Sequence, residues 1–169
     1  DLSAFLIGLD LNYKASSVWN LGLGFEIQSG NAYDGDSSEN KAFTPLYGTN
    51  HKFNGFMDYF YVGNHINSTG LVDAFAKVNA KLNDKSSLGL WIHNFSSYAE
   101  IANGVKKQLG TEVDLQYNYT FTKDVAVGAG YSQMFASEGM EVLKNNSDGN
   151  INNWAWVMIT INPTIFTSK

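Results

Sequence analysis

The sequence predicts an all-β fold, an antiparallel, up-and-down β-barrel that crosses a membrane, and three observations lead to this prediction. Apolar and polar residues alternate along several segments, as they do in strands with one apolar and one wet face. The clearest segment, Leu109–Phe121, runs for thirteen residues, whereas an ordinary strand has about five or six and a membrane-crossing strand needs about nine to eleven. The connections between these segments are alternately short and long, as in outer-membrane barrels.

Seven segments carry the alternation strongly enough to be predicted as strands. In the third, for example, Val72, Ala74 and Ala76 alternate with Asp73 and Lys77. The seven predicted strands are residues 5–14, 19–28, 72–82, 87–95, 109–121, 125–132 and 156–165. No segment is a convincing helix, and residues 98–107 are too few and too polar to assign.

The connections predict how the strands are oriented. Residues 15–18, 83–86 and 122–124 are short connections, and residues 29–70, 96–108 and 136–152 are long ones. If the short turns are periplasmic, the first predicted strand starts outside, whereas a barrel with an even number of strands starts inside. We therefore expect at least one further strand before residue 1. Residues 1–169 would then be a single segment, of about seven or eight strands, from the C-terminal part of a larger barrel.

The long loop at about 29–70 is rich in aromatic residues. Residues 55–63 could form an eighth strand, but this strand would break the short–long alternation, so we assign them to the loop. A loop of this length is usually functional or disordered, and this one is too apolar for disorder. Two interpretations remain: it folds inward to narrow or cap the lumen, or it packs as a surface loop with an extra hairpin. The candidate residues for a constriction or docking loop are Phe43, Tyr47, His51, Lys52, Phe56, Asp58 and Tyr59.

Aromatic residues near the strand ends support a membrane location. Tyr13, Trp19, Tyr119 and Phe121 flank short turns, and a second set lies toward the long loops. This second set is Phe5, Phe25, Phe135, Trp154 and Trp156. Two such groups are typical of the interfacial girdles of a membrane barrel. The alternative is a soluble β-sandwich, whose core is also rich in aromatic residues.

The polar positions of the strands would face the lumen. The proposed lumen-lining residues are Asp10, Lys14, Glu26, Gln28, Asp73, Lys77, Lys81, His93, Glu112, Asp114 and Gln116. The net charge of −5 argues against nucleic acid as a partner. The chain has no cysteine, and therefore no disulfide framework.

The sequence gives little reason to expect catalysis or a cofactor. His51, His65 and His93 are the only histidines, and no nucleophile or zinc-ligand spacing surrounds them. We therefore predict that the protein is not an enzyme and has no catalytic residues. Asp34, Asp36 and Glu39 could offer oxygen ligands to Ca²⁺. A solvated acidic loop is the commoner explanation for such a group of carboxylates.

Two stretches, FTPLYGTNHKFNGFMDYF at Phe43–Phe60 and NNWAWVMITINPTIF at Asn152–Phe166, resemble the alginate-export family of outer-membrane porins in its Bacteroidetes-type branch. The resemblance implies a barrel of about eighteen strands in a Gram-negative outer membrane, with a polar lumen that passes an anionic polysaccharide. The alginate exporter has an arginine-rich constriction, whereas this chain has no arginine. Phe166 also falls on the opposite strand parity from Ile165, so either the face assignment or a bulge near Pro163 needs revision.

The leading functional hypothesis is a porin-like channel in the bacterial outer membrane, for diffusion or export of a polysaccharide or another polar solute. Its partners would be outer-membrane lipid, the solute and, through the external loops, other proteins. One alternative is a structural or binding subunit of a cell-surface assembly. The other is a soluble lipocalin-like barrel that binds a ligand, in which Val113, Leu115 and Tyr117 would point inward.

Overall fold

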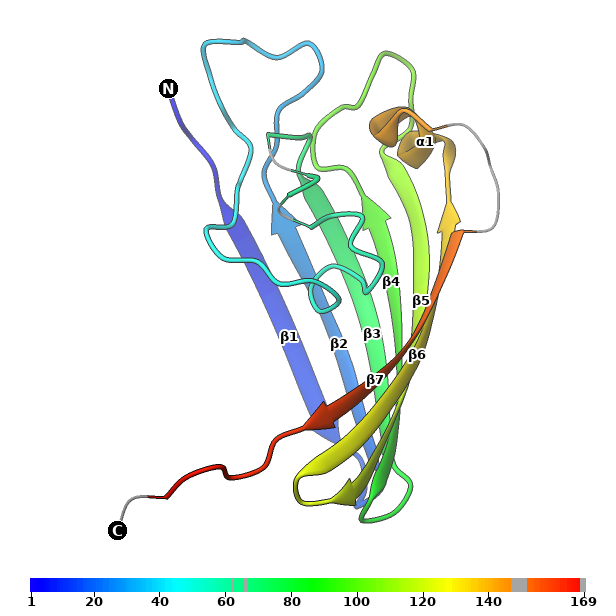
Figure 1. Ribbon diagram of the computed structural model, residues 1–169. Helices are drawn as coiled ribbons and strands as arrows, with labels where there is room; N and C mark the ends of the chain where they lie inside the picture. The colour runs from blue at the N-terminus through cyan, green and yellow to red at the C-terminus, as the bar shows by residue number, and fades with distance from the viewer. Residues whose placement is uncertain (62, 66, 147–151, 168–169) are drawn as a thin grey trace.

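The computed structural model describes residues 1–61, 63–65, 67–146 and 152–167, and these form one curved antiparallel sheet with a single short helix (Figure 1). Each strand pairs with its neighbours in sequence, in the order β1-β2-β3-β4-β5-β6-β7. The strands are β1 (Leu6–Lys14), β2 (Trp19–Gln28), β3 (Leu71–Lys81), β4 (Ser86–Ser96), β5 (Gln108–Thr122), β6 (Val125–Ala136) and β7 (Asn152–Ile161). Within the described residues, β1 and β7 each pair on one side only, so the sheet is open.

The seven predicted strands are confirmed. The alternation of connections is confirmed as well: long connections gather at one end of the sheet and the three short turns at the other (Figure 1). Residues 55–61 and 63 form turns and bends, so they contribute no eighth strand to the sheet.

The last strand differs most from its predicted bounds. β7 begins earlier, at Asn152, and its pairing with β6 ends at Ile161. Asn162 still donates a backbone hydrogen bond to the Asp124 carbonyl at 2.9 Å, but Pro163 has no N–H to continue the ladder. Phe166 therefore lies beyond the strand, and the conflict in its parity disappears.

The prediction that the chain has no helix is wrong. Helix α1 (Glu138–Lys144) spans seven residues between β6 and β7 and ends at Asn145 in the left-handed conformation, with φ 51°. Two turns of helix are too short to show a clear sequence period. Its buried Met140 packs in a cluster with Leu109 and Met134, so tertiary packing stabilises it. No helix of the described residues is both long and apolar enough to cross a membrane.

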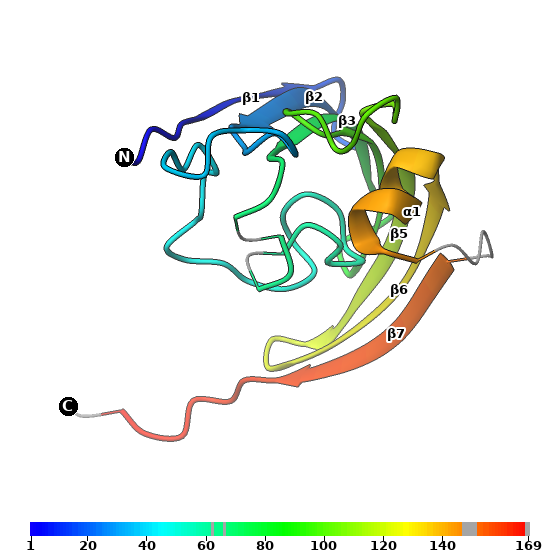
Figure 2. The same ribbon diagram turned by 90° about the horizontal axis from the view of Figure 1, so that it is seen from above.

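The pairing register gives each face of the sheet its own chemistry. One cross-strand row is Asp10, Gly24, Phe75, His93, Glu112 and Met134, and the adjacent row is Leu11, Leu23, Ala76, Ile92 and Val113. Successive residues of a strand point to opposite faces, so the two rows lie on opposite faces of the sheet. The first row includes Glu112, which binds the loop inside the curve of the sheet (Figure 2), so its face is the concave one. The second row lies on the convex face.

The convex face is apolar and exposed. Leu23 and Ile159 are each 64% exposed. Other exposed apolar side chains at convex positions include Ile7, Leu9, Leu11, Tyr13, Trp19, Leu21, Phe25, Ile92, Leu115, Tyr117, Tyr131, Phe135, Val157 and Ile161. Val113, Leu115 and Tyr117 lie opposite the face of Glu112 and Asp114. The inward orientation that a lipocalin-like barrel requires for these three residues is therefore not found.

Two members of the predicted aromatic girdles lie on the other face. Trp154 pairs with Ser132 and Trp156 with Gly130, so both are at concave positions. The indole of Trp156 covers Gly130, which leaves room for it because it has no Cβ. The girdle prediction is wrong for these two residues, because the strand parity of β7 assigns them to the polar face.

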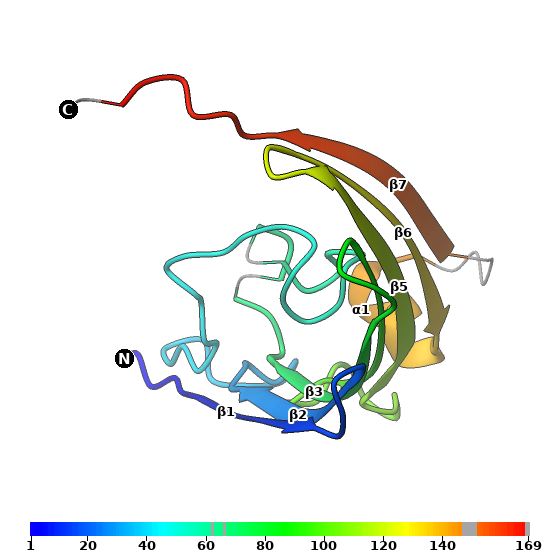
Figure 3. The ribbon, with the colours of Figure 1, turned by 90° about the horizontal axis from the view of Figure 1, so that it is seen from below.

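The long loop between β2 and β3 lies inside the curve of the sheet, as Figures 2 and 3 show from opposite ends. Its Phe60 joins a buried cluster at the end of the sheet that carries the long connections. The buried members of this cluster are Phe60, Leu71, Phe95, Ile101, Leu109, Met134 and Met140. Of the two interpretations of the loop, inward folding is therefore the one observed.

Candidate functional site

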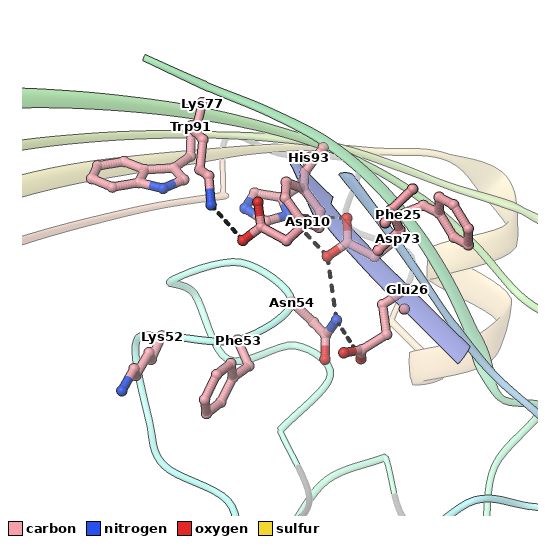
Figure 4. A pocket seen from close by; sticks show the side chains of 13 residues that line it. Asp10, Phe25, Glu26, Lys52, Phe53, Asn54, Asp73, Lys77, Trp91 and His93 are labelled. Atoms are coloured by element: carbon pink, nitrogen blue, oxygen red, sulfur yellow. Dashed lines mark hydrogen bonds and ion pairs between the residues drawn. The ribbon is translucent and has the colours of Figure 1, made fainter. Parts of the chain in front are cut away.

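The candidate site lies where residues 50–58, which we call the loop tip, meet the concave face (Figure 4). The tip contains three residues that are not glycine but have positive φ: His51 at 57°, Asn54 at 52° and Asp58 at 59°. Gly55 follows Asn54 with φ 85°. Such backbone conformations are uncommon outside glycine and require support from their surroundings.

The carboxylate of Glu112 provides that support. Glu112 is 0% exposed, and its Oε1 accepts hydrogen bonds from the backbone N–H groups of Phe56 at 2.6 Å and Met57 at 2.9 Å. The left-handed turn at Asn54 and Gly55 precedes these two amides, and successive amides after such turns often form an anion-binding concavity. Here the anion is a side chain of β5, so the sheet itself holds the loop tip.

Asn54 forms the second attachment. Its Nδ2 lies 3.1 Å from Glu26 Oε1 and 3.3 Å from Asp73 Oδ2, and its Oδ1 accepts from Gln28 Nε2 at 3.3 Å (Figure 4). One amide therefore connects the tip to β2 and β3 at once. Together with Glu112, it attaches the tip across three different strands.

Aromatic contacts surround these polar attachments. The Phe56 ring packs on Trp91 of β4 with centroids 5.0 Å apart, and the His51 ring stacks on Trp154 of β7 at 4.2 Å. His51 Nδ1 lies 2.8 Å from the Phe56 carbonyl oxygen and 2.9 Å from Asp58 Oδ2. Both partners are acceptors, so this nitrogen carries the proton.

Three buried carboxylates lie around one imidazole on the concave face. His93 Nδ1 is 3.0 Å from both oxygens of Asp73, and its Nε2 is 4.0 Å from Asp114 Oδ2. Asp114 is 0% exposed, and neither of its oxygens makes a well-formed hydrogen bond with any described residue. Glu112, the third carboxylate, has the same lack of a partner at Oε2. Buried carboxyl groups are costly unless they are neutral or paired, and in this cluster Glu112 is paired with the loop tip through Oε1.

A cavity of about 510 Å³ lies beside this cluster, between the tip and strands β1–β4. The strands contribute Asp10, Glu26, Lys77 and Trp91 to its wall, and the tip contributes Phe53 and Asn54. Lys77 Nζ is 2.6 Å from Asp10 Oδ2 and 5.7 Å from the Phe75 ring centroid. The wall therefore combines carboxylates, an amide and ammonium groups with aromatic rings.

The predicted lumen residues all fall at concave positions by register. They are not equally close to the loop tip: Lys14 and Lys81 lie at the ends of β1 and β3 that precede short turns. Lys81 is exposed and pairs with Asp84 of the adjoining turn at 2.6 Å. Gln116 is likewise farther along β5 than Glu112 and Asp114, which contact the tip or His93.

Four of the predicted loop residues lie at the loop tip, and the other three lie elsewhere in the loop. His51, Phe56 and Asp58 belong to the tip contacts, and Lys52 lines the cavity. Tyr59 packs beside the buried cluster at the end of the sheet. Phe43 donates its backbone N–H to the Ser29 carbonyl at 2.9 Å, away from the tip. Tyr47 is 92% exposed.

Sequence reasoning missed Asn54, Gly55 and Trp91 as site residues. The Asn54-Gly55 dipeptide is itself a turn signal and could have identified the tip. Trp91 carries no comparable signal, because only the strand register shows that it lies under Phe56.

The proposed calcium ligands do not form a site. Asp36 Oδ1 accepts from the Ser38 backbone N–H at 2.8 Å, and Glu39 pairs with Lys41 at 2.7 Å. Across the described ranges, no group of three His, Asp or Glu side chains could hold a metal ion. Asp36 and Glu39 thus make separate contacts within the loop.

No protein-family model and no curated protein matches this chain. The resemblance to alginate-export porins therefore remains a prediction from the two quoted stretches.

Gly55→Ala is expected to release the loop tip. A Cβ at Gly55 would lie 2.6 Å from Glu112 Oε1, and φ is 85°. Gly104→Ala is the matched control, since Gly104 has φ 77° with no atom within 4 Å of the added carbon. We expect hydrogen exchange at the Phe56 and Met57 amides to accelerate by about tenfold or more in Gly55→Ala. Equal protection in both variants would contradict this account.

His65 makes the loop sensitive to acid. Burial lowers the pKa of His65 to about 4, and the positive charge of Lys144 acts in the same direction. An unfolded histidine titrates near 6.5, so this contribution to stability is complete above that pH and decreases as the pH falls toward 4. The loss is at most about 3 kcal/mol. His65 Nε2 lies 3.2 Å from the Gly70 carbonyl oxygen, a bond that a glutamine can replace.

We therefore expect His65→Gln to lose less stability than the wild type between pH 7 and pH 4.5. Denaturant midpoints at both pH values measure this difference, and the subtraction removes carboxylate titrations common to both proteins. Parallel pH profiles would show that His65 does not contribute.

Proposed function

We propose that this chain forms part of an outer-membrane β-barrel channel, with the concave face as its lumen and the loop tip as its constriction. The observation that carries the proposal is the inverted distribution of polarity. Leu23 and Ile159 are each 64% exposed on the convex face, whereas Glu112 and Asp114 are fully buried on the concave one. Lipid would cover the convex face and water would fill the lumen.

The strand lengths agree with this proposal. The strands have between 9 and 15 residues, and about nine to eleven are needed to cross a bilayer at a tilt. Exposed aromatic side chains also stand near both ends of the convex face, with Tyr13 and Trp19 by a short turn and Phe135 by a long connection. Aromatic residues at two levels suit the two membrane interfaces.

Among the residues that the structure describes, nothing pairs with the outer edges of β1 and β7, and this is further support. An exposed strand edge tends to pair with another strand, and a closed barrel removes both edges at once. Further strands would join these edges and complete a barrel wide enough for an aqueous passage. The loop tip then sets the size of solute that passes, and the transport requires no covalent chemistry.

A second function, as a binding subunit of a surface assembly, is favoured by one observation. Leu46 and Tyr47 are 91% and 92% exposed in the same loop whose tip is firmly attached. Exposed apolar side chains on a positioned loop suit contact with another protein. Retention of all partners by a Leu46→Ser/Tyr47→Ser variant would argue against this second function.

The tip is expected to limit the conductance of the full-length protein in planar lipid bilayers. Replacing residues 50–58 with a short Gly-Ser linker should raise the single-channel conductance, because it removes side chains and backbone from the passage. Leu46→Ser/Tyr47→Ser should change the conductance far less, since it removes no backbone and both side chains are almost fully exposed rather than packed against the tip. A wild-type protein that inserts but never conducts would overturn the channel proposal.

Tryptophan quenching tests the membrane orientation independently of transport. Trp19 is exposed at a convex position, and Trp91 lies at a concave one beneath Phe56. In variants of the full-length protein that keep one tryptophan each, we expect brominated lipid to quench Trp19 strongly and Trp91 weakly. The reverse order would contradict lipid contact on the convex face.

A further inference from the structure

Carboxylates outnumber ammonium groups along the middle of the concave face. The five carboxylates at concave positions are Asp10, Glu26, Asp73, Glu112 and Asp114. Among the strand residues of this region, Lys77 is the lysine that can balance their charge, because Lys14 and Lys81 lie at the strand ends by the short turns. From this imbalance we infer that the passage beneath the loop tip favours cations over anions, an inference that rests on the proposed channel function.

Lys77 shows how the wall accommodates a positive charge. Its Nζ lies 2.6 Å from Asp10 Oδ2 and 5.7 Å from the Phe75 ring centroid, and its side chain is 17% exposed. A carboxylate and an aromatic face together are a favourable environment for an ammonium group. Lys77 neutralises one of the five carboxylates and leaves the others without a lysine partner among the described residues.

The deepest carboxyl groups lie behind the cavity wall. Glu112 Oε2 and both oxygens of Asp114 are buried, and none of them makes a hydrogen bond of normal geometry with the part of the chain that the structure describes. His93 Nδ1 is hydrogen-bonded to Asp73, and its other ring nitrogen, Nε2, lies 4.0 Å from Asp114 Oδ2. These two side chains lie outside the cavity wall, so the negative charge of the passage itself comes from Asp10, Glu26 and Asp73.

The loop tip adds one ammonium group, that of Lys52, to the cavity wall, and this group lies apart from the strand carboxylates (Figure 4). Figure 4 shows Asn54 directed toward Glu26 and Asp73, whereas the Lys52 ammonium points away from the strand carboxylates. Lys52 Nζ instead lies 5.3 Å from the centroid of the Phe53 ring. A narrow passage between low-dielectric walls concentrates the field of its charges, so a small excess of carboxylates is enough to select ions.

The permeant class follows from this charge and from the cavity of about 510 Å³. Inorganic cations and small amine-bearing polar solutes fit the wall, because they can replace the interactions that Lys77 makes with Asp10 and Phe75. An anionic polysaccharide would meet carboxylates at the narrowest point. The inference therefore opposes the substrate class that the family resemblance implies.

Reversal potentials of the full-length protein under a KCl gradient test the inference. The wild type should pass K⁺ in preference to Cl⁻. Asp10→Asn/Glu26→Gln should lower the permeability ratio of K⁺ to Cl⁻ by about twofold or more, and Lys77→Met should raise it. Asp34→Asn/Glu39→Gln is the matched control, because it removes the same two charges from an exposed part of the loop and should leave the ratio unchanged.

The outcomes separate the two proposals. A channel that conducts but prefers Cl⁻, or does not discriminate, overturns cation selectivity and leaves the channel function standing. A protein that inserts without any conductance overturns the channel function itself. If the double variant fails to insert, Lys77→Met decides alone, since an unchanged or lowered ratio in that variant contradicts the inference.

Discussion

The hydrogen bonds from Phe56 and Met57 to Glu112 are the interaction on which the rest of the concave face depends. They hold a long irregular segment against a sheet and allow its tip to keep uncommon backbone conformations. The tip in turn covers Trp91 and Trp154 and encloses the cavity beside β1–β4. Without this attachment the carboxyl groups of the sheet would face open water.

The sheet reverses the usual arrangement of a soluble protein. Soluble folds bury their apolar faces because burial of each square ångström of apolar surface contributes about 25 cal/mol. Here the buried side carries the charges, and a long row of aliphatic and aromatic side chains stands outside. Such an arrangement is stable only if another apolar phase or further protein covers the outer face.

Alternation along the chain was enough to predict all seven strands and the face of nearly every strand residue, because a period of two is imposed by the backbone itself. Trp154 and Trp156 show the limit of reasoning from residue type: their size suggested an interface, but their parity directs them inward. Helix α1 was missed because two turns leave no period to detect. The contacts of Asn54, Gly55 and Trp91 join segments far apart in sequence, and no local pattern encodes which carboxylate a loop amide will meet.

The tip binds a residue that is far away in the sequence, and this affects the order in which the fold assembles. Every strand pairs with its immediate neighbour in the chain, so the sheet grows by local hairpins that close short loops at small entropic cost. The bond from Phe56 to Glu112 joins residues 56 positions apart, and its acceptor lies two strands beyond β3. The tip can bind Glu112 in its native position only after β3, β4 and β5 have paired, so the concave face stays uncovered until then.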